Sequence, residues 1–303
     1  MTPEGRTRSI LLRIFLGPNG IRAGWRFLIY LILAIVIIGV LFHFALHSAP
    51  WRIPDLRLGK VMPRELIFLF AALAAAWIMT KIERRPFGSY GLPWKGSLWG
   101  RLCEGAAWGL GAMTLVLLIL HAAHSFSFGS AELHGRQFLF YAFGWGVYFL
   151  VVGLYEEFTF RGYSQFTLTT GMGFWPAAFL LSTLFGVGHL PNPGENWIGV
   201  VQVFLTGLLL CVCLKRTGNL WFPVGLHGAW DWAETFLYGV PDSGLTFRGH
   251  FLNPTFHGPK WLTGGSAGPE GSIVTLLVEI AIIGLVMVRF PVPRKTVQNA
   301  TNS

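Results

Sequence analysis

The chain has 303 residues, of which 53% are hydrophobic and only 12% are charged. An ordinary soluble domain carries about 25% charged residues, so this composition excludes a soluble enzyme, a disordered chain and a coiled coil. The net charge of +9 at pH 7 would suggest a nucleic acid partner for a soluble protein. In a membrane protein such an excess instead indicates basic cytoplasmic loops, so we expect no nucleic acid partner.

Apolar stretches recur along the chain, and eight of them predict membrane-spanning helices. The first follows a basic N-terminal segment, and its apolar run at 27–46 is longer than the roughly 7–15 residues of a signal-peptide core. We therefore expect it to be retained as a helix. The predicted fold is all-α, a polytopic membrane bundle of about eight helices, with spans near 25–47, 64–82, 98–121, 137–160, 174–190, 197–215, 220–238 and 273–290.

Charge and composition also predict how the chain is organised. We expect a cytoplasmic segment at 1–24, one membrane domain at 25–290 and a flexible cytoplasmic tail at 291–303. With both termini inside, cytoplasmic segments carry about twice as many Lys and Arg residues as the outer loops. This asymmetry predicts a multi-pass protein of a bacterial-type plasma membrane with both termini in the cytoplasm.

One long connection, residues 239–272, is rich in Gly and Pro. It could be a lid, a dimer contact or a solvated connector, and the connector is the preferred interpretation. Within it, residues 264–268 match Gly-x-Ser-x-Gly, but no predicted strand precedes them, so we interpret the match as chance. The three cysteines (Cys103, Cys211 and Cys213) lie in apolar stretches and predict no disulfide framework.

The predicted fourth span ends in Leu-Tyr-Glu-Glu-Phe-Thr-Phe-Arg, which places Glu156 beside Glu157. An ionisable residue inside a span is costly unless it is paired or solvated by a cavity. Arg161 lies four residues after Glu157, so the two share a helix face and can form an ion pair. Glu156 points about 100° away and remains available as a general base. A salt bridge at the membrane surface is the alternative interpretation of the Glu157–Arg161 pair.

Two later spans carry histidines. The fifth contains Phe-Gly-Val-Gly-His at 185–189, whose two glycines would let another backbone or a substrate approach closely. The seventh contains His227-Gly-Ala-Trp-Asp231, which places an imidazole and a carboxylate four residues apart on one face. Taken alone, His189 or the His227–Asp231 pair could be an ordinary structural hydrogen-bonding group.

Together, three spans supply six ionisable groups that are more easily stabilised around one wet cavity than separately. These candidate site residues are Glu156, Glu157, Arg161, His189, His227 and Asp231. Carboxylates and imidazoles can activate water with or without a metal ion. A divalent metal such as zinc is therefore a possible cofactor, although the sequence has no His-Glu-x-x-His motif. Its candidate ligands are Glu156, His189, His227 and Asp231.

Three motifs in this order carry a family resemblance: Glu-Glu-x-x-x-Arg at 156–161, Phe-x-x-x-His at 185–189 and His-x-x-x-Asp at 227–231. They resemble the CPBP family of type II CAAX prenyl endopeptidases and bacteriocin-processing proteins, also called Abi. The resemblance covers roughly residues 135–240, where we expect the catalytic core. Residues 85–93 also resemble the run that precedes the core in this family.

The resemblance implies a multi-span intramembrane protease in which Glu156 is the base and His189 holds the same water. It implies that Glu157 and Arg161 support this site.

By the same resemblance, His227 and the last motif position would stabilise the oxyanion. That position is often Asn in the family and is Asp231 here. An ionised Asp cannot donate a hydrogen bond, so Asp231 could instead orient His227 or bind a metal.

The expected partners are membrane lipid and a peptide or prenylated protein substrate, with the oligomeric state left open. Two other functions compete with the endopeptidase. A non-catalytic binding, immunity or scaffold protein could use the same polar cavity. A small transporter could couple a carboxylate to proton movement, although the chain shows no pair of broken helices of the kind that transporters use.

Overall fold

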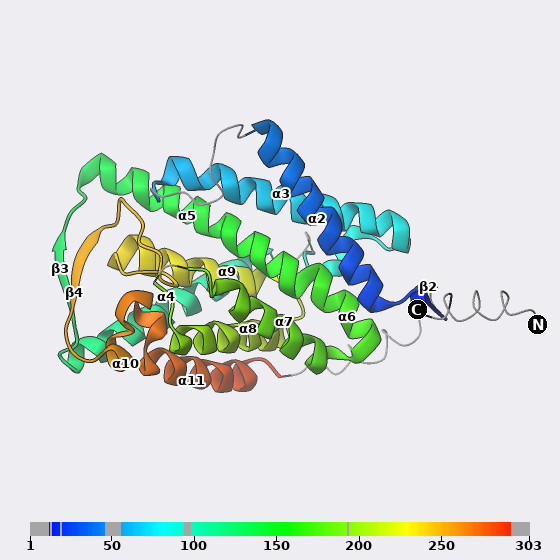
Figure 1. Ribbon diagram of the computed structural model, residues 1–303. Helices are drawn as coiled ribbons and strands as arrows, with labels where there is room; N and C mark the ends of the chain where they lie inside the picture. Colours follow the sequence, from blue (N-terminus) through cyan, green and yellow to red (C-terminus); the bar gives the residue numbers. More distant parts are fainter. Residues whose placement is uncertain are drawn as a thin grey trace, which may run out of the picture.

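The computed structural model describes residues 12, 14–18, 20–45, 56–93, 98–192 and 194–291. The predicted tail after residue 291 and most of the basic N-terminal segment lie outside the described residues. The described chain is a helical bundle (Figure 1), as the sequence predicts. Its main helices are α2 (Ala23–Ala45), α3 (Leu58–Glu83), α4 (Leu98–Ala122), α5 (Gly135–Glu157), α6 (Gln165–Met172), α7 (Phe174–His189), α8 (Trp197–Thr217), α9 (Trp221–Trp232) and α11 (Ile273–Arg289).

Each of the eight predicted spans coincides with one of these helical segments. By length and composition, five segments could cross a membrane: Ala23–Phe44, Leu58–Glu83, Leu98–Ala122, Gly135–Met172 and Trp197–Thr217. α7 is a shorter apolar helix, so the count of eight is approximate. Large apolar side chains are exposed along the outer helices, as Ile35 of α2 and Phe143 of α5 illustrate. Such a surface is expected of helices that face lipid.

The fourth span is longer than predicted, because the helix does not stop near residue 160. A π-helical turn, η2 (Phe158–Ser164), joins α5 to α6, and the three form one apolar helical segment of 38 residues. Within the turn, Gly162 has a non-helical backbone (φ −83°, ψ −108°) and marks a kink. A second π-helical turn, η3 (Ala233–Tyr238), extends α9. π-Helical turns inside α-helices are frequent at functional sites.

α9 lies at the centre of the bundle, where it packs against α4, α5 and α8 (Figure 1). Glycines bring its backbone close to α5. A Cβ atom on Gly228 would lie 2.7 Å from the carbonyl oxygen of Phe149, and one on Gly153 would lie 3.1 Å from that of Val224. The close approach places the third motif beside the first.

Two strands, β3 (Phe126–Ala131) and β4 (Leu252–Phe256), pair antiparallel along one edge of the bundle (Figure 1). The sequence does not predict them. They fasten the 239–272 connection to the turn between α4 and α5. A second, two-residue pair, β1 (Leu16–Gly17) with β2 (Gly20–Ile21), precedes α2.

The 239–272 connection is folded against the bundle, so the preferred prediction of a solvated connector is wrong. It also contains α10 (Lys260–Thr263) and two 3₁₀ turns, η4 (Gly265–Ala267) and η5 (Pro269–Gly271). Val240, Phe247, Ala267 and Glu270 are all buried.

A further 3₁₀ turn, η1 (Phe87–Tyr90), follows α3. Cys103, Cys211 and Cys213 are free thiols, as predicted.

Candidate active site

A cavity of about 110 Å³ lies among the motif-bearing helices. A cavity needs roughly 10–15 Å³ of volume to hold one water molecule, so this cavity has room for several water molecules. Four of the six predicted site residues line it: Glu156, His189, His227 and Asp231. The structure therefore brings residues from α5, α7 and α9 to one polar cavity, as predicted.

The Glu doublet divides into one anchored and one accessible carboxylate. Glu157 is fully buried, and its Oε1 accepts hydrogen bonds from Nη1 of Arg161 at 3.1 Å and from Nδ1 of His227 at 2.9 Å. Glu156 faces the cavity with 21% of its side chain exposed, and its Oε2 lies 3.7 Å from Nε2 of His227. The predicted Glu157–Arg161 pair is present, and both side chains are buried inside the protein.

Arg161 is 1% exposed and lies behind the cavity. Its guanidinium is 4.3 Å from the centre of the Phe185 ring, a cation–π contact that links η2 to α7. Its Nε and Nη2 groups have no hydrogen-bond partner among the described residues. Arg161 therefore depends on Glu157 and Phe185 to stabilise its buried charge, and it fixes both in return.

The His227 ring lies between three carboxylates. Because an ionised carboxylate can only accept a hydrogen bond, the contact with Glu157 places a proton on Nδ1. The other nitrogen, Nε2, lies 3.4 Å from Oδ2 of Asp231 and 3.7 Å from Oε2 of Glu156. The ring orientation is thus determined from both sides, and Nε2 is directed at the cavity wall formed by Glu156 and Asp231.

His189 approaches the same cavity from the C-terminal end of α7. Its Nδ1 donates to the carbonyl oxygen of Phe185 at 2.8 Å, which leaves Nε2 for the cavity. Among the described residues, no hydrogen bond or ion pair joins His189 directly to Glu156. The predicted close approach is present at Gly186, where a Cβ atom would lie 3.0 Å from the carbonyl oxygen of Val200, but not at Gly188, where a Cβ atom would have no neighbour within 4 Å.

Six further ionisable residues line the cavity and were not predicted: Arg64, Glu65, Tyr148, Asp242, Glu270 and Glu279. Arg64 and Glu65 form an ion pair at 2.7 Å near the start of α3. Glu65 and Glu279 lie inside predicted spans. Because a charged side chain in an apolar helix is energetically costly, their positions could have identified them as candidate site residues. No comparable signal was available for Asp242 and Glu270, which reach the cavity from the 239–272 connection.

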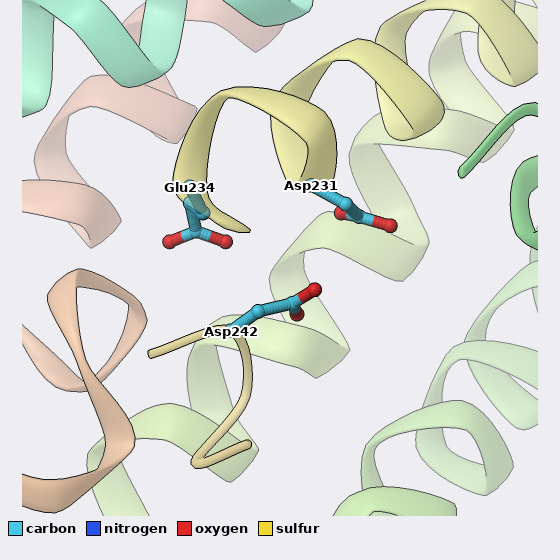
Figure 2. A group of neighbouring side chains, drawn as sticks. All are labelled: Asp231, Glu234 and Asp242. Carbon is cyan, nitrogen blue, oxygen red and sulfur yellow. The ribbon is translucent and has the colours of Figure 1, made fainter. Parts of the chain in front are cut away.

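Three of the predicted metal ligands are neighbours, since Nε2 of His227 lies 3.7 Å from Oε2 of Glu156 and 3.4 Å from Oδ2 of Asp231. Among the described residues, His189 forms no hydrogen bond or ion pair with any of them. In the described part of the chain, one group of three candidate ligands has its ligand atoms within 4.8 Å of one another, and it consists of Asp231, Glu234 and Asp242 (Figure 2). This group includes neither histidine.

Comparison with known proteins agrees with this geometry. Residues 137–233 match the family model described as type II CAAX prenyl endopeptidase Rce1-like. The matched segment runs from α5 through α9 and contains all six predicted site residues. No curated protein gives a significant match to the chain. The match confirms the resemblance to the CPBP family over residues 137–233 of this integral membrane protein.

Proposed function

We propose that the protein is a membrane-embedded endopeptidase in which Glu156 activates a water molecule. The observation that carries this proposal is that the two adjacent glutamates have different surroundings. Glu157 is buried and bound by two partners, whereas Glu156 faces a cavity that it shares with His189. The Rce1-like family model over the same segment supports peptide hydrolysis as the activity.

In the proposed reaction, a water molecule is held between the Glu156 carboxylate and Nε2 of His189. Glu156 accepts a proton from this water as its oxygen attacks the carbonyl carbon of the scissile peptide bond. When the carbon–nitrogen bond breaks, the same proton passes from Glu156 to the leaving amine. One water is consumed, and a carboxylic acid and an amine are released.

The remaining site residues position these groups. Arg161 holds Glu157, and Glu157 holds the His227 ring so that Nε2 faces the cavity. When Nε2 carries a proton, it can donate to the oxyanion that develops on the attacked carbonyl. Asp231, at 3.4 Å from Nε2, orients the ring in this proposal, because an ionised carboxylate cannot itself donate.

The proposed substrate is a peptide or protein presented at the membrane, including one with a prenylated CAAX terminus. The test is cleavage of a farnesylated CAAX peptide by the full chain in proteoliposomes. Because general acid–base catalysis contributes roughly 10²–10⁴-fold, we expect Glu156→Gln to lower kcat at least a hundredfold. His189→Ala should lower kcat strongly as well.

The matched control is Glu132→Gln, which makes the same substitution at a carboxylate 43% exposed at the end of β3. It should cleave like the wild type, and all variants should insert and unfold thermally as the wild type does. Undiminished cleavage by folded Glu156→Gln would overturn the mechanism. A wild-type protein that binds the peptide without cleaving it would instead identify a non-catalytic binding protein.

A further inference from the structure

We propose that Asp231, Glu234 and Asp242 form a binding site for a divalent cation, separate from the water held by Glu156 and His189. One carboxylate oxygen from each of the three lies within 4.8 Å of the others (Figure 2). Asp231 comes from α9, Glu234 from the π-helical turn η3, and Asp242 from the connection that follows. Three carboxylates from three successive segments therefore converge.

Glu234 provides an observation independent of this proximity. It is fully buried, and neither oxygen of its carboxylate has a hydrogen-bond partner among the described residues. Burying an ionised carboxylate without a partner is strongly unfavourable, so such a group is protonated, is paired with an opposite charge or coordinates a metal. Glu234 points toward the space that it shares with Asp231 and Asp242 (Figure 2). A cation in that space would supply the missing partner.

The three carboxylates also have few positively charged partners, which favours a bound cation. Asp231 has an ion-pair contact with His227 at 3.4 Å, and Oδ2 of Asp242 accepts from Thr235 at 3.4 Å. In the described ranges, no Lys or Arg side chain forms an ion pair with any of the three carboxylates. When all three carboxylates are ionised, one imidazole and one hydroxyl do not balance their negative charge at this separation.

The backbone on either side of the group is held in place. The backbone N–H of Val240 donates to the carbonyl oxygen of Glu234 at 2.9 Å, which folds the connection back onto η3. Glu270 accepts from the backbone N–H of Ser243 at 2.8 Å and from the indole N–H of Trp230 at 3.2 Å. These two donors are the sequence neighbours of Asp242 and Asp231. The group is therefore largely preorganised, as a metal site requires.

The donor atoms indicate which cation would bind. All three ligands are carboxylate oxygens, the set that suits Mg²⁺, Ca²⁺ and Mn²⁺ rather than softer ions that prefer sulfur or imidazole ligands. These ions bind more ligands than three side chains supply, and the adjoining cavity has room for water at the remaining positions. The cation would also hold Asp231 beside His227.

The test uses the full chain in detergent, stripped with EDTA and titrated with Mn²⁺ alone, with bound ion followed by electron paramagnetic resonance. We expect one Mn²⁺ per chain, displaced by excess Mg²⁺ or Ca²⁺. Glu234→Gln and Asp242→Asn should each weaken Mn²⁺ binding at least tenfold. Mn²⁺ should raise the thermal unfolding temperature of the wild type, and it should raise that of either variant less.

Two controls locate the ion. Glu132→Gln should bind Mn²⁺ like the wild type. His189→Ala should also retain Mn²⁺, because His189 is outside the group, and this outcome separates the site from a metal at the proposed catalytic water. If Glu234→Gln does not fold, Asp242→Asn decides the question.

The proposal is overturned if the wild type binds no Mn²⁺ and its unfolding temperature is unchanged. It is also overturned if both carboxylate variants bind normally, or if binding is lost in His189→Ala while the carboxylate variants retain it. Failure of the Mn²⁺ titration would leave peptide cleavage by Glu156 untouched, and loss of cleavage in Glu156→Gln would leave the cation site untouched. The two proposals therefore fail separately.

Discussion

Nδ1 of His227 lies 2.9 Å from Oε1 of Glu157, and the same oxygen accepts a hydrogen bond from Arg161. One buried oxygen thus receives two N–H donors from two separate helical segments. The contact joins the third motif to the first. By holding Nδ1, it directs the Nε2 edge of the His227 ring toward the cavity. Glu157 does not line the cavity, and we expect it to act by positioning His227.

Removing one partner of the Glu157–Arg161 pair should be strongly destabilising. We expect Glu157→Ala to lower the free energy of unfolding by about 3–5 kcal/mol, because it leaves the Arg161 charge buried and uncompensated. Arg161→Ala should lower the free energy of unfolding by a similar amount, because it leaves the buried Glu157 carboxylate without its cationic partner. Denaturant or thermal unfolding in detergent measures both.

The combined variant Glu157→Leu with Arg161→Met is the control for charge burial. Replacing a buried ion pair by apolar side chains of similar volume is often neutral, so most of the lost stability should return. Peptide cleavage should not return, because His227 no longer has its carboxylate partner. Single variants as stable as the wild type would contradict this interpretation of the pair.

The close packing of α9 on α5 predicts a steric effect at Gly228. A Cβ atom there would lie 2.7 Å from the carbonyl oxygen of Phe149, so Gly228→Ala must push the two backbones apart. We expect a loss of about 1–3 kcal/mol in stability, together with reduced cleavage because His227 is the adjacent residue.

Gly188→Ala is the matched control, since a Cβ atom at that helical position has no neighbour within 4 Å. Its stability should be unchanged, or higher by up to about 1 kcal/mol, because alanine is the better helix former. Equal destabilisation by both substitutions would show that the contact with Phe149 is not responsible.

Glu195, in the connection between α7 and α8, predicts a pH dependence of stability. Burial raises the pKa of its carboxyl above the ordinary value of 4.5, and nearby Glu270 adds to this shift, although the backbone N–H of Asn196 and the His189 ring oppose it. The folded state therefore binds this proton more tightly than the unfolded state does. The resulting stabilisation is fully present below about pH 4.5 and is lost as pH rises through the raised pKa.

Glu195→Gln removes this titration. Thermal unfolding measured from pH 4 to pH 8 should show the variant gaining stability relative to the wild type as the pH rises. Parallel unfolding curves over this range would show that Glu195 does not contribute to the pH dependence.

The proposed topology predicts opposite accessibility for the end of α3 and the 239–272 connection. In a Cys103→Ser background, Arg84→Cys should be protected from a membrane-impermeant maleimide in intact cells, whereas Lys260→Cys should react. Both native side chains are exposed, so burial does not limit the reaction. Labelling with the reverse pattern would place both termini outside.

Hydropathy predicts the helices well because a membrane span must be both long and apolar. α4, predicted at 98–121, runs from Leu98 to Ala122. The Glu157–Arg161 pair follows from its spacing of four residues, although the turn that contains it is π-helical. These features depend on residues close together in the sequence, which is why local patterns identify them.

Features that depend on distant partners could not be predicted in this way. β3 has the sequence Phe-Ser-Phe-Gly-Ser-Ala, and its partner β4 lies more than 100 residues away, so neither strand carries a strong local signal. Asp242 and Glu270 belong to a polar, Gly/Pro-rich segment that resembles an exposed loop. Only the packing of this segment against distant helices, including that of η5 against α8 and α11, places these two carboxylates at the cavity.

The continuous segment α5–η2–α6 has a consequence for the depth of the reaction. Its 38 residues, at about 1.5 Å each, extend about 57 Å along the helix, nearly twice the roughly 30 Å thickness of a bilayer's hydrocarbon core. The α6 end carries polar contacts, since Arg26 binds both Glu83 and Thr170 there. Glu156 lies 14 positions before Thr170 in the sequence, about 21 Å along the helix. A bond cleaved by Glu156 would therefore be attacked before the kink at Gly162, away from that polar end and at the cavity that the 239–272 connection helps to line.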